Sequence, residues 1–215
     1  MTSTYNLLHV DASARTRSFS RRLSAAHAEA WRARHPGGGY RYRDLAADPV
    51  PHITEPWTEL CDAVLGAGIT DIAEYASVVR TPEQHAAWAV VEPLLSELVA
   101  ADTVLIGTPM YNFGVPSALK AWLDQVTFPR MSLRGRRFVV VGARGGTYLP
   151  GTPRAPYDHE ERYLRDFFAG HFAVEDVTFV HAELTNALVD PRLADRLGDH
   201  EASLADALAL AEVTA

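Results

Sequence analysis

The sequence contains one cysteine, Cys61, in 215 residues, so no disulfide can form within the chain. It also lacks an excess of basic residues: the formal net charge is −7, which argues against nucleic acid or an anionic membrane as the main partner. No apolar run reaches the roughly 18 to 20 residues that a membrane-spanning helix needs. The opening Met-Thr-Ser-Thr lacks the basic and apolar regions of a secretory signal, and we therefore expect a cytoplasmic protein with no membrane partner.

Several motifs that carry chemistry are missing as well. Neither G-x-G-x-x-G nor G-x-x-x-x-G-K-[ST] occurs, which disfavours a dinucleotide-binding Rossmann site and a P-loop. No G-x-S-x-G elbow is present, and Cys61 has no recognisable histidine partner in the sequence, so a hydrolase is disfavoured. The nine histidines show no H-E-x-x-H or other metal-ligand spacing, and we predict no metal site.

The composition that remains is that of an ordinary globular protein, with 47% hydrophobic and 22% charged residues, and we treat residues 1–215 as one domain. Short apolar runs predict strands, whereas apolar residues spaced by three and four predict helices. The expected strands are 5–10, 40–45, 103–108, 138–142 and 174–181. The expected helices are 20–35, 82–99, 117–126, 160–172 and 190–213, with broken helical pieces over 55–75. Pro93 should kink or divide the second of these helices.

This alternation of strands and helices predicts the fold class. Apolar strands joined by helices indicate an open parallel sheet covered on both faces, that is, an α/β/α sandwich of three layers. Five strands fit the doubly wound, flavodoxin-like order 2-1-3-4-5. In that order a ligand binds beyond the carboxyl ends of the strands, at the topological switch point between strands 1 and 3. The loops after strands 1, 3 and 4 are therefore the expected site.

Residues 11–20, after the first strand, are rich in hydroxyl groups, including those of Ser13, Ser18 and Ser20, and lead directly into a helix. A helix amino terminus has unpaired N–H groups and a positive dipole end, so hydroxyl donors around it can hold a phosphate. A serine N-cap flanked by solvent-facing arginines would explain the same residues.

The loops after the third and fourth strands suit a flat ligand. Pro109-Met110-Tyr111-Asn112-Phe113 could offer backbone polar groups to the edge of a heterocycle while its aromatic rings cover the surface. A loop that only seals the core is the alternative. Arg144-Gly145-Gly146 allows close approach of the backbone to a ligand, although a tight turn would also account for two glycines.

The S-x-S of the first loop, the block MYNFGVPSALKAWLD and the RGG after the fourth strand together resemble the FMN-dependent NADH azoreductases and NADH:quinone oxidoreductases of bacteria, which have a flavodoxin-like fold. The resemblance extends from about residue 5 to residue 210. It implies tightly bound FMN, with its phosphate and ribityl chain held by Ser13, Ser18 and Ser20. The other cofactor-binding positions that it implies are Phe19, Pro109, Met110, Tyr111, Asn112, Phe113, Ala143, Arg144, Gly145 and Gly146.

The resemblance also implies a reaction: NADH or NADPH reduces the flavin, and a quinone or azo compound then takes two electrons in a ping-pong cycle. It further implies a homodimer with the active site at the interface. Because the flavin is the redox group, we assign no catalytic side chain. The aromatic residues that we consider as walls for a flat acceptor are Trp57, Phe128, Tyr148, Phe168 and Phe172, although residues of this kind more often lie in the core.

Two features depart from the family pattern. Many members have serine where this chain has Ala143, which leaves backbone contacts alone at that point. The segment 127–137 is shorter than the projecting segment that usually helps to shape the substrate mouth. We therefore expect substrate range to be the property that transfers least.

Two other functions remain open from the sequence. A flavodoxin-like carrier would pass single electrons to a protein partner and would need no nicotinamide site. A binding or regulatory module could retain the fold without any cofactor. Reduction of the yellow protein by NADH alone would separate the enzyme from the carrier, and a colourless protein that refuses FMN would indicate the module.

Overall fold

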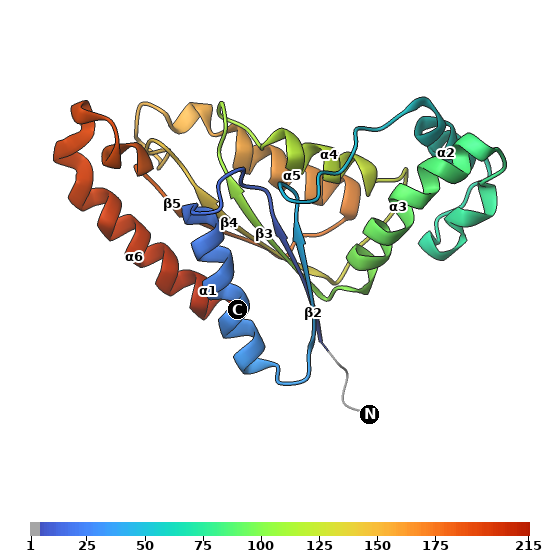
Figure 1. Ribbon diagram of the computed structural model, residues 1–215, viewed down its shortest axis with the longest axis horizontal. Coiled ribbons are helices and arrows are strands. Elements are labelled where there is room, and N and C mark those ends of the chain that lie inside the picture. The colour runs from blue at the N-terminus through green and yellow to red at the C-terminus, as the bar shows by residue number, and fades with distance from the viewer. Residues whose placement is uncertain (1–4) are drawn as a thin grey trace.

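The computed structural model describes residues 5–215 and shows a central sheet between two layers of helices (Figure 1). The first four residues, on which the expectation about a secretory signal depends, lie outside the described residues. The strands are β1 (Asn6–Asp11), β2 (Gly39–Asp44), β3 (Thr103–Pro109), β4 (Arg137–Ala143) and β5 (Val177–Ala182). They form one parallel sheet in the order β2-β1-β3-β4-β5, so the predicted fold class and strand order are confirmed.

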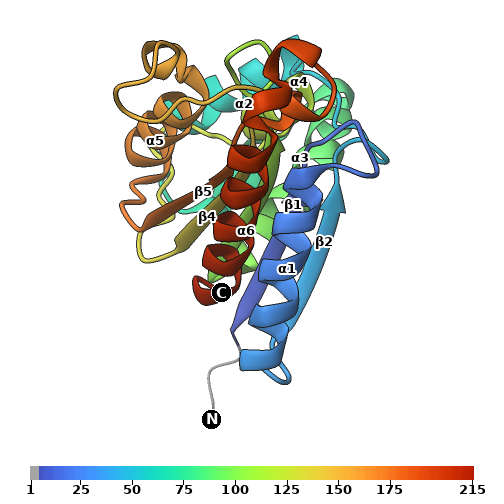
Figure 2. The same ribbon diagram turned by 90° about the vertical axis from the view of Figure 1, so that its left-hand side faces the viewer.

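The helices divide between the two faces of this sheet. They are α1 (Phe19–Arg34), α2 (Glu55–Gly66), α3 (Pro82–Ala100), α4 (Ser117–Gln125), α5 (His159–Phe172) and α6 (Leu197–Val213). Helices α1 and α6 lie side by side on one face, and the other four helices lie on the opposite face (Figures 1 and 2). In β3, Val104 and Ile106 join the core under α3, whereas Leu105 joins the core under α1. Burial on both faces explains why the strand reads as a continuous apolar run.

Of the two effects predicted for Pro93, a kink or a division of the helix, the division does not occur, because α3 continues from Pro82 to Ala100. Pro93 lies on the exposed side of α3, and so does Ala89, whose carbonyl loses its helical partner at the proline. That carbonyl can therefore be hydrated. The buried residues Leu94 and Leu98 hold the following turns against the sheet.

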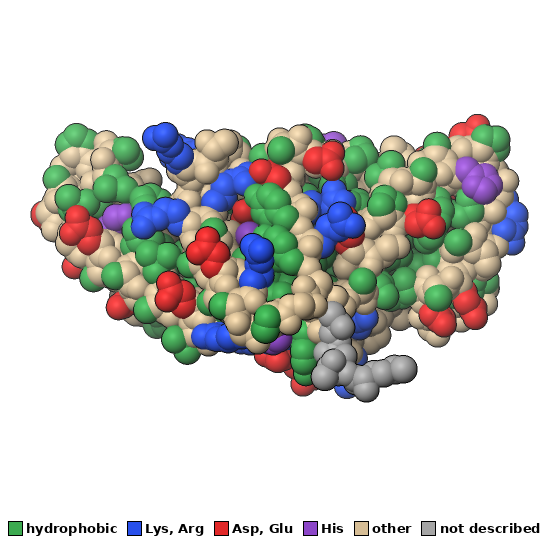
Figure 3. Space-filling model, turned by 60° about the horizontal axis from the view of Figure 1, so that its bottom comes forward, with side chains coloured by type: hydrophobic (Ala, Val, Ile, Leu, Met, Phe, Trp, Pro, Cys, Tyr) green, Lys and Arg blue, Asp and Glu red, His purple; other side chains and the backbone are tan. Residues whose placement is uncertain are grey.

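Acidic and basic side chains are interspersed on the face of the molecule shown in Figure 3, and neither kind gathers into a large area of one sign. This distribution agrees with the modest negative net charge. No helix of the described chain, residues 5–215, is both long and apolar enough to cross a membrane.

His27 is buried between α1 and α6, where its Nδ1 lies 2.9 Å from the carbonyl oxygen of Ala211. Burial lowers the pKa of this imidazole to about 4 from its usual 6.5. Between these two pH values the unfolded chain binds a proton that the folded chain does not bind, so stability falls as the pH falls. We expect this group to remove about 3 kcal/mol of unfolding free energy between pH 7 and pH 4.

Urea denaturation across that range, compared with a His27→Gln variant, measures this contribution. Glutamine can still donate to the Ala211 carbonyl but does not titrate, so the variant should lose less stability in acid. An identical pH dependence in both proteins would contradict the assignment.

Candidate functional site

A cavity of about 350 Å³ opens at the carboxyl end of the sheet, among the loops that follow β1, β3, β4 and β5. The three loops that the sequence singled out are thus brought together at the predicted edge. This volume lies in the range of about 300 to 1,000 Å³ that is usual for small-molecule sites. The lining residues are Ser13, Arg15, Arg17, Ser18, Phe19, Pro109, Met110, Tyr111, Asn112, Phe113, Ala143, Gly145, Gly146, Tyr148, Arg154, Thr185 and Asn186.

The loop after β1 presents hydroxyl groups at the start of α1. Ser18 is the N-cap of this helix, and its Oγ accepts a hydrogen bond from the backbone N–H of Arg21 at 3.1 Å. Ser20 is fully buried and does not line the cavity; its Oγ lies 3.1 Å from that of Ser18. Ser13 and Ser18 therefore face the cavity directly, whereas Ser20 acts on the cavity through Ser18. The backbone N–H groups of the first helical turn point to the same place.

Three guanidinium groups give the cavity a positive character although the protein is acidic overall. Arg15, Arg17 and Arg154 line it and are exposed. In the described part of the chain none of the three forms an ion pair, so each is available to an anionic ligand.

The loop after β3 is a tight, strained turn. Tyr111 and Gly114 exchange two backbone hydrogen bonds of 3.0 Å, and between them Asn112 and Phe113 have φ angles of +50° and +68°. Asparagine tolerates this left-handed conformation better than phenylalanine does. The turn leaves Tyr111 38% exposed and Phe113 42% exposed at the cavity. Strain of this kind is concentrated at binding sites, where the surrounding structure holds it.

The loop after β4 is fixed by the loop after β5. The backbone N–H groups of Thr185 and Asn186 donate to the carbonyl oxygens of Arg144 and Gly145 at 3.0 and 3.1 Å. Gly145 lets the Asn186 side chain approach closely, since a Cβ would lie 2.7 Å from Nδ2 of Asn186 and the amide would have to move. In the described part of the chain, Gly145 and Gly146 are hydrogen-bonded through their carbonyl oxygens alone, which leaves their N–H groups as free donors.

Sequence reasoning missed Thr185 and Asn186. They follow β5. The rule that ligands bind beyond the carboxyl ends of parallel strands applies to this strand as well. Their residue types alone carry no signal.

Arg144, a cofactor-binding position implied by the resemblance, does not line the cavity. Its buried guanidinium lies 2.9 Å from Asp158 and 3.5 Å from both Glu161 and Glu183, and it contacts Nε2 of His181 at 2.9 Å. A guanidinium taken out of water needs carboxylate partners. Its partners Asp158, Glu161 and Glu183 do not line the cavity.

The predicted aromatic walls separate into two groups. Tyr148 lines the cavity, and its ring centroid is 6.4 Å from that of Phe113. The other candidates do not line it: Phe128, Phe168 and Phe172 are fully buried in the core, and Trp57 packs against Phe128 with a centroid distance of 5.6 Å. Burial of large apolar rings explains their positions, and the prediction that they contact an acceptor is wrong for this chain's own cavity.

The short segment 127–137 also packs inward, since Phe128, Met131 and Leu133 are all buried. It therefore adds no projecting wall beside the cavity. Ala143 lines the cavity without a hydroxyl group, as the sequence predicted.

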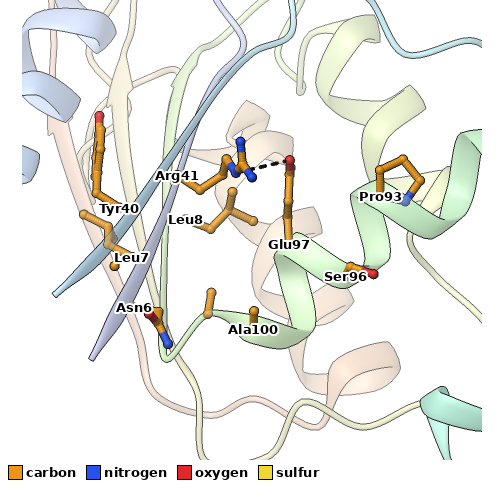
Figure 4. Close-up of a pocket in the computed structure, with 11 residues that line it drawn as sticks. Asn6, Leu7, Leu8, Tyr40, Arg41, Pro93, Ser96, Glu97 and Ala100 are labelled. Carbon is orange, nitrogen blue, oxygen red and sulfur yellow. Dashed lines mark ion pairs between the residues drawn. The ribbon is translucent and has the colours of Figure 1, made fainter. Parts of the chain in front are cut away.

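A second hollow of about 450 Å³ lies at the opposite, amino end of the sheet, between β1, β2 and α3 (Figure 4). It is lined by residues such as Leu8 and Pro93, with an ion pair of 3.6 Å between Arg41 and Glu97 at its side. Ligands of parallel α/β sheets bind at the carboxyl ends of the strands, so this hollow is not the candidate site. No group of three metal-ligating side chains occurs among residues 5–215.

Known proteins resemble this chain in sequence and in fold. The family described as having a flavodoxin-like fold matches residues 5–206. The chain is 68% identical over 202 residues to an FMN-dependent NADH:quinone oxidoreductase of Nocardia farcinica, with 94% of each chain covered. It is 41% identical over 210 residues to the enzyme of the same name from Streptomyces avermitilis, covering 94% of this chain and 91% of that one.

Solved structures share the fold. An azoreductase from Bacillus anthracis str. Sterne superimposes with a TM-score of 0.73 at 22% identity, covering 97% of this chain and 99% of that one. An FMN-dependent NADH-azoreductase from the Ames Ancestor strain, in complex with FMN, has a TM-score of 0.71 at 22% identity and covers 97% and 100%.

Proposed function

Since the chain belongs to the flavodoxin-like fold family, we propose that it is an FMN-dependent oxidoreductase that takes electrons from NADH and reduces quinones and azo compounds. The observation that carries this proposal is one cavity with an N-capped helix at one end and an aromatic turn at the other. The first element suits a phosphate, and the second suits a flat ring. Both elements meet at the topological switch point between β1 and β3.

The residues fit FMN in the following way. Ser13, Ser18 and the first backbone N–H groups of α1 hold the phosphate, and Ser20 orients Ser18. Met110, Tyr111, Asn112 and Phe113 line the ring. The free N–H groups of Gly145 and Gly146 face its pyrimidine side, where they can donate to oxygen or nitrogen atoms that gain negative charge. FMN supplies the two-electron redox chemistry, and the protein supplies placement, electrostatics and shelter from water.

The cationic rim of the cavity supports the assignment of a dinucleotide as the electron donor. The side chains of Arg15, Arg17 and Arg154 are positively charged and can attract phosphates. None of the three forms an ion pair within the described residues. They raise the local concentration of an anionic donor near the ring.

We also propose a homodimer with the site at its interface. Large apolar side chains are exposed in the segments after β3, β4 and β5, which also supply the cavity lining: Tyr111, Phe113, Leu149, Tyr157, Leu188 and Val189. The rings of Phe113 and Tyr157 are in contact, with centroids 5.5 Å apart, and exposed apolar surface at the mouth of a site supports an interface there. Light scattering coupled to size-exclusion chromatography should give twice the chain mass of 23.6 kDa. A cytoplasmic location fits the single buried free thiol of Cys61.

The test of the function is anaerobic titration of the flavin-loaded protein. NADH alone should bleach the yellow flavin absorbance, and a quinone added afterwards should restore it. A protein that takes up FMN but is not reduced by NADH would contradict the reductase, and a protein that does not take up FMN would contradict the site itself.

Asn112 offers a test of the turn. We expect Asn112→Ala and Asn112→Gly both to lower kcat/KM about fivefold, because each removes one polar contact. Only Asn112→Ala should also lower the unfolding free energy, by about 1 kcal/mol, because alanine is strained at a φ of +50° whereas glycine is not. Steady-state kinetics and urea denaturation separate the two effects. Wild-type turnover in the glycine variant would show that the amide takes no part.

A further inference from the structure

We propose that Arg21 is a positioning residue for the cofactor: it ties the phosphate-binding loop to the edge strand β2 and so sets the preference for FMN over riboflavin. This inference rests on the proposed FMN site. Arg21 does not line the cavity: it is the third residue of α1, and its guanidinium group contacts Asp44 at the end of β2. Its effect on the cofactor must therefore pass through other residues.

The guanidinium group of Arg21 connects three elements at once. Its two terminal nitrogens each donate to one carboxylate oxygen of Asp44, at 2.7 Å, where β2 ends. The nitrogen Nη2 also donates to the carbonyl oxygen of Ser13 at 2.8 Å. The backbone N–H of the same residue donates to Oγ of Ser18. Arg21 thus contacts both serines that face the cavity, one through its side chain and the other through its backbone.

The bond to the Ser13 carbonyl fixes one peptide plane of the loop. Ser13 lies two residues beyond the end of β1, and its Oγ accepts a hydrogen bond from the N–H of Arg15 at 3.2 Å. Without the guanidinium, that carbonyl would be free to rotate and the Ser13 hydroxyl would lose its orientation. Asp44 is itself held, because its Oδ1 accepts from the N–H groups of Ala46 and Ala47. The loop is therefore fastened to a rigid partner.

Charge gives a second reason for an arginine at this position. Asp11 is buried at the end of β1, with its Oδ2 3.7 Å from Nη1 of Arg21 and 3.0 Å from the hydroxyl of Tyr42. Gly107 makes room for this carboxylate, since a Cβ there would lie 2.1 Å from Asp11 Oδ1. Two carboxylates, those of Asp11 and Asp44, would otherwise stand near a site for a phosphate. The single positive charge of Arg21 lies against both carboxylates and offsets part of their negative charge.

Lysine cannot replace this arginine, because a single ammonium group does not bind a carboxylate in two places and a carbonyl at the same time. The chain contains a matched control. Arg43, on the opposite face of β2, makes the same two-pronged contact with Glu97 at 2.8 and 3.0 Å, and its side chain is 14% exposed, as is that of Arg21. Arg43 has no contact with the phosphate-binding loop in the described structure.

The experiment compares wild type, Arg21→Lys and Arg43→Lys, each as the full chain stripped of flavin. Fluorescence titration with FMN and with riboflavin gives two dissociation constants for each protein. Riboflavin has the same ring and ribityl chain but no phosphate. We expect Arg21→Lys to reduce the preference for FMN at least about tenfold, and Arg43→Lys to leave it within about twofold.

An unchanged FMN-to-riboflavin ratio in Arg21→Lys would overturn the inference, and so would equal weakening of both flavins. A wild-type protein that binds neither flavin would instead overturn the proposed function. Thermal unfolding of the stripped proteins shows whether Arg21→Lys is folded. If it is not, Asp44→Glu is decisive, because it keeps both charges but displaces the carboxylate that holds the guanidinium by one methylene group: a lower ratio supports the inference and an unchanged ratio overturns it.

Discussion

Replacing Ser18 and Ser20 together with alanine should weaken FMN binding about a hundredfold, since hydrogen bonds to a charged group contribute about 1.5 to 3 kcal/mol each. Ser18 faces the cavity and caps α1, while the buried Ser20 hydroxyl, 3.1 Å away, holds that of Ser18 in place. Ser20→Ala alone should therefore have the smaller effect of the two single changes. Fluorescence titration of the stripped protein with FMN measures each loss.

Loss of a helix cap is a separate effect and needs its own control. Thr81 caps α3, and its Oγ1 accepts from the N–H of Gln84 at 3.2 Å, far along the chain from the cavity loops. Thr81→Ala and Ser18→Ala should each lower the unfolding free energy by about 1 kcal/mol. Only Ser18→Ala should weaken FMN binding. Wild-type FMN affinity in the double serine variant would contradict the assignment of these serines to phosphate binding.

Glu160→Gln should make the protein more stable in mild base. Glu160 is completely buried at the start of α5; its Oε1 accepts from the hydroxyl of Thr108 at 3.1 Å, and its Oε2 has no hydrogen-bond partner. Burial raises the pKa of this carboxyl to about 8, against the opposing effect of Arg144. At neutral pH the folded protein therefore holds a proton that the unfolded chain has released.

The sign of the pH effect follows from that proton. The folded state binds more protons than the unfolded state between about pH 4.5 and pH 8, so the contribution of Glu160 to stability is complete below this window and is lost as the pH rises through it. The loss amounts to about 4 kcal/mol. Glutamine resembles the protonated acid in shape and does not titrate. The variant should match wild type at pH 5 and exceed it by several kcal/mol at pH 8.5.

Urea denaturation at both pH values tests this expectation. Glu201→Gln, on the exposed side of α6, controls for the removal of one carboxyl group. A Glu160→Gln variant that gains nothing at pH 8.5 relative to wild type would show that this carboxyl is ionised in the folded protein. Thr108, which donates to Glu160, directly precedes Pro109 at the cavity. The same titration therefore measures how firmly Glu160 holds the start of the loop after β3.

The fold could be predicted from the sequence because its central strands β1, β3 and β4 are covered on both faces. A run such as Val104–Ile106 shows no polar position on either face, unlike an amphipathic helix. The cavity loops followed from topology, since every strand of a parallel sheet ends at the same edge.

Side-chain direction could not be predicted in the same way. Phe168 and Tyr148 are both large aromatic residues, yet one fills the core and the other lines the cavity. Arg144 follows β4 directly but turns toward Asp158. This partner comes close in space only when α5 packs beside the sheet. Such choices depend on neighbours that the chain order does not reveal.

The turn at Tyr111–Gly114 has one more consequence. Its backbone is bent and closed by two hydrogen bonds within the chain, and the glycine loop beside it is tied by further backbone hydrogen bonds to the segment after β5. Little conformational entropy then remains to be lost when a flavin arrives. Reconstitution of the stripped protein should therefore proceed as a single fast phase with a small heat-capacity change, and repeated removal and reloading should leave the scaffold intact.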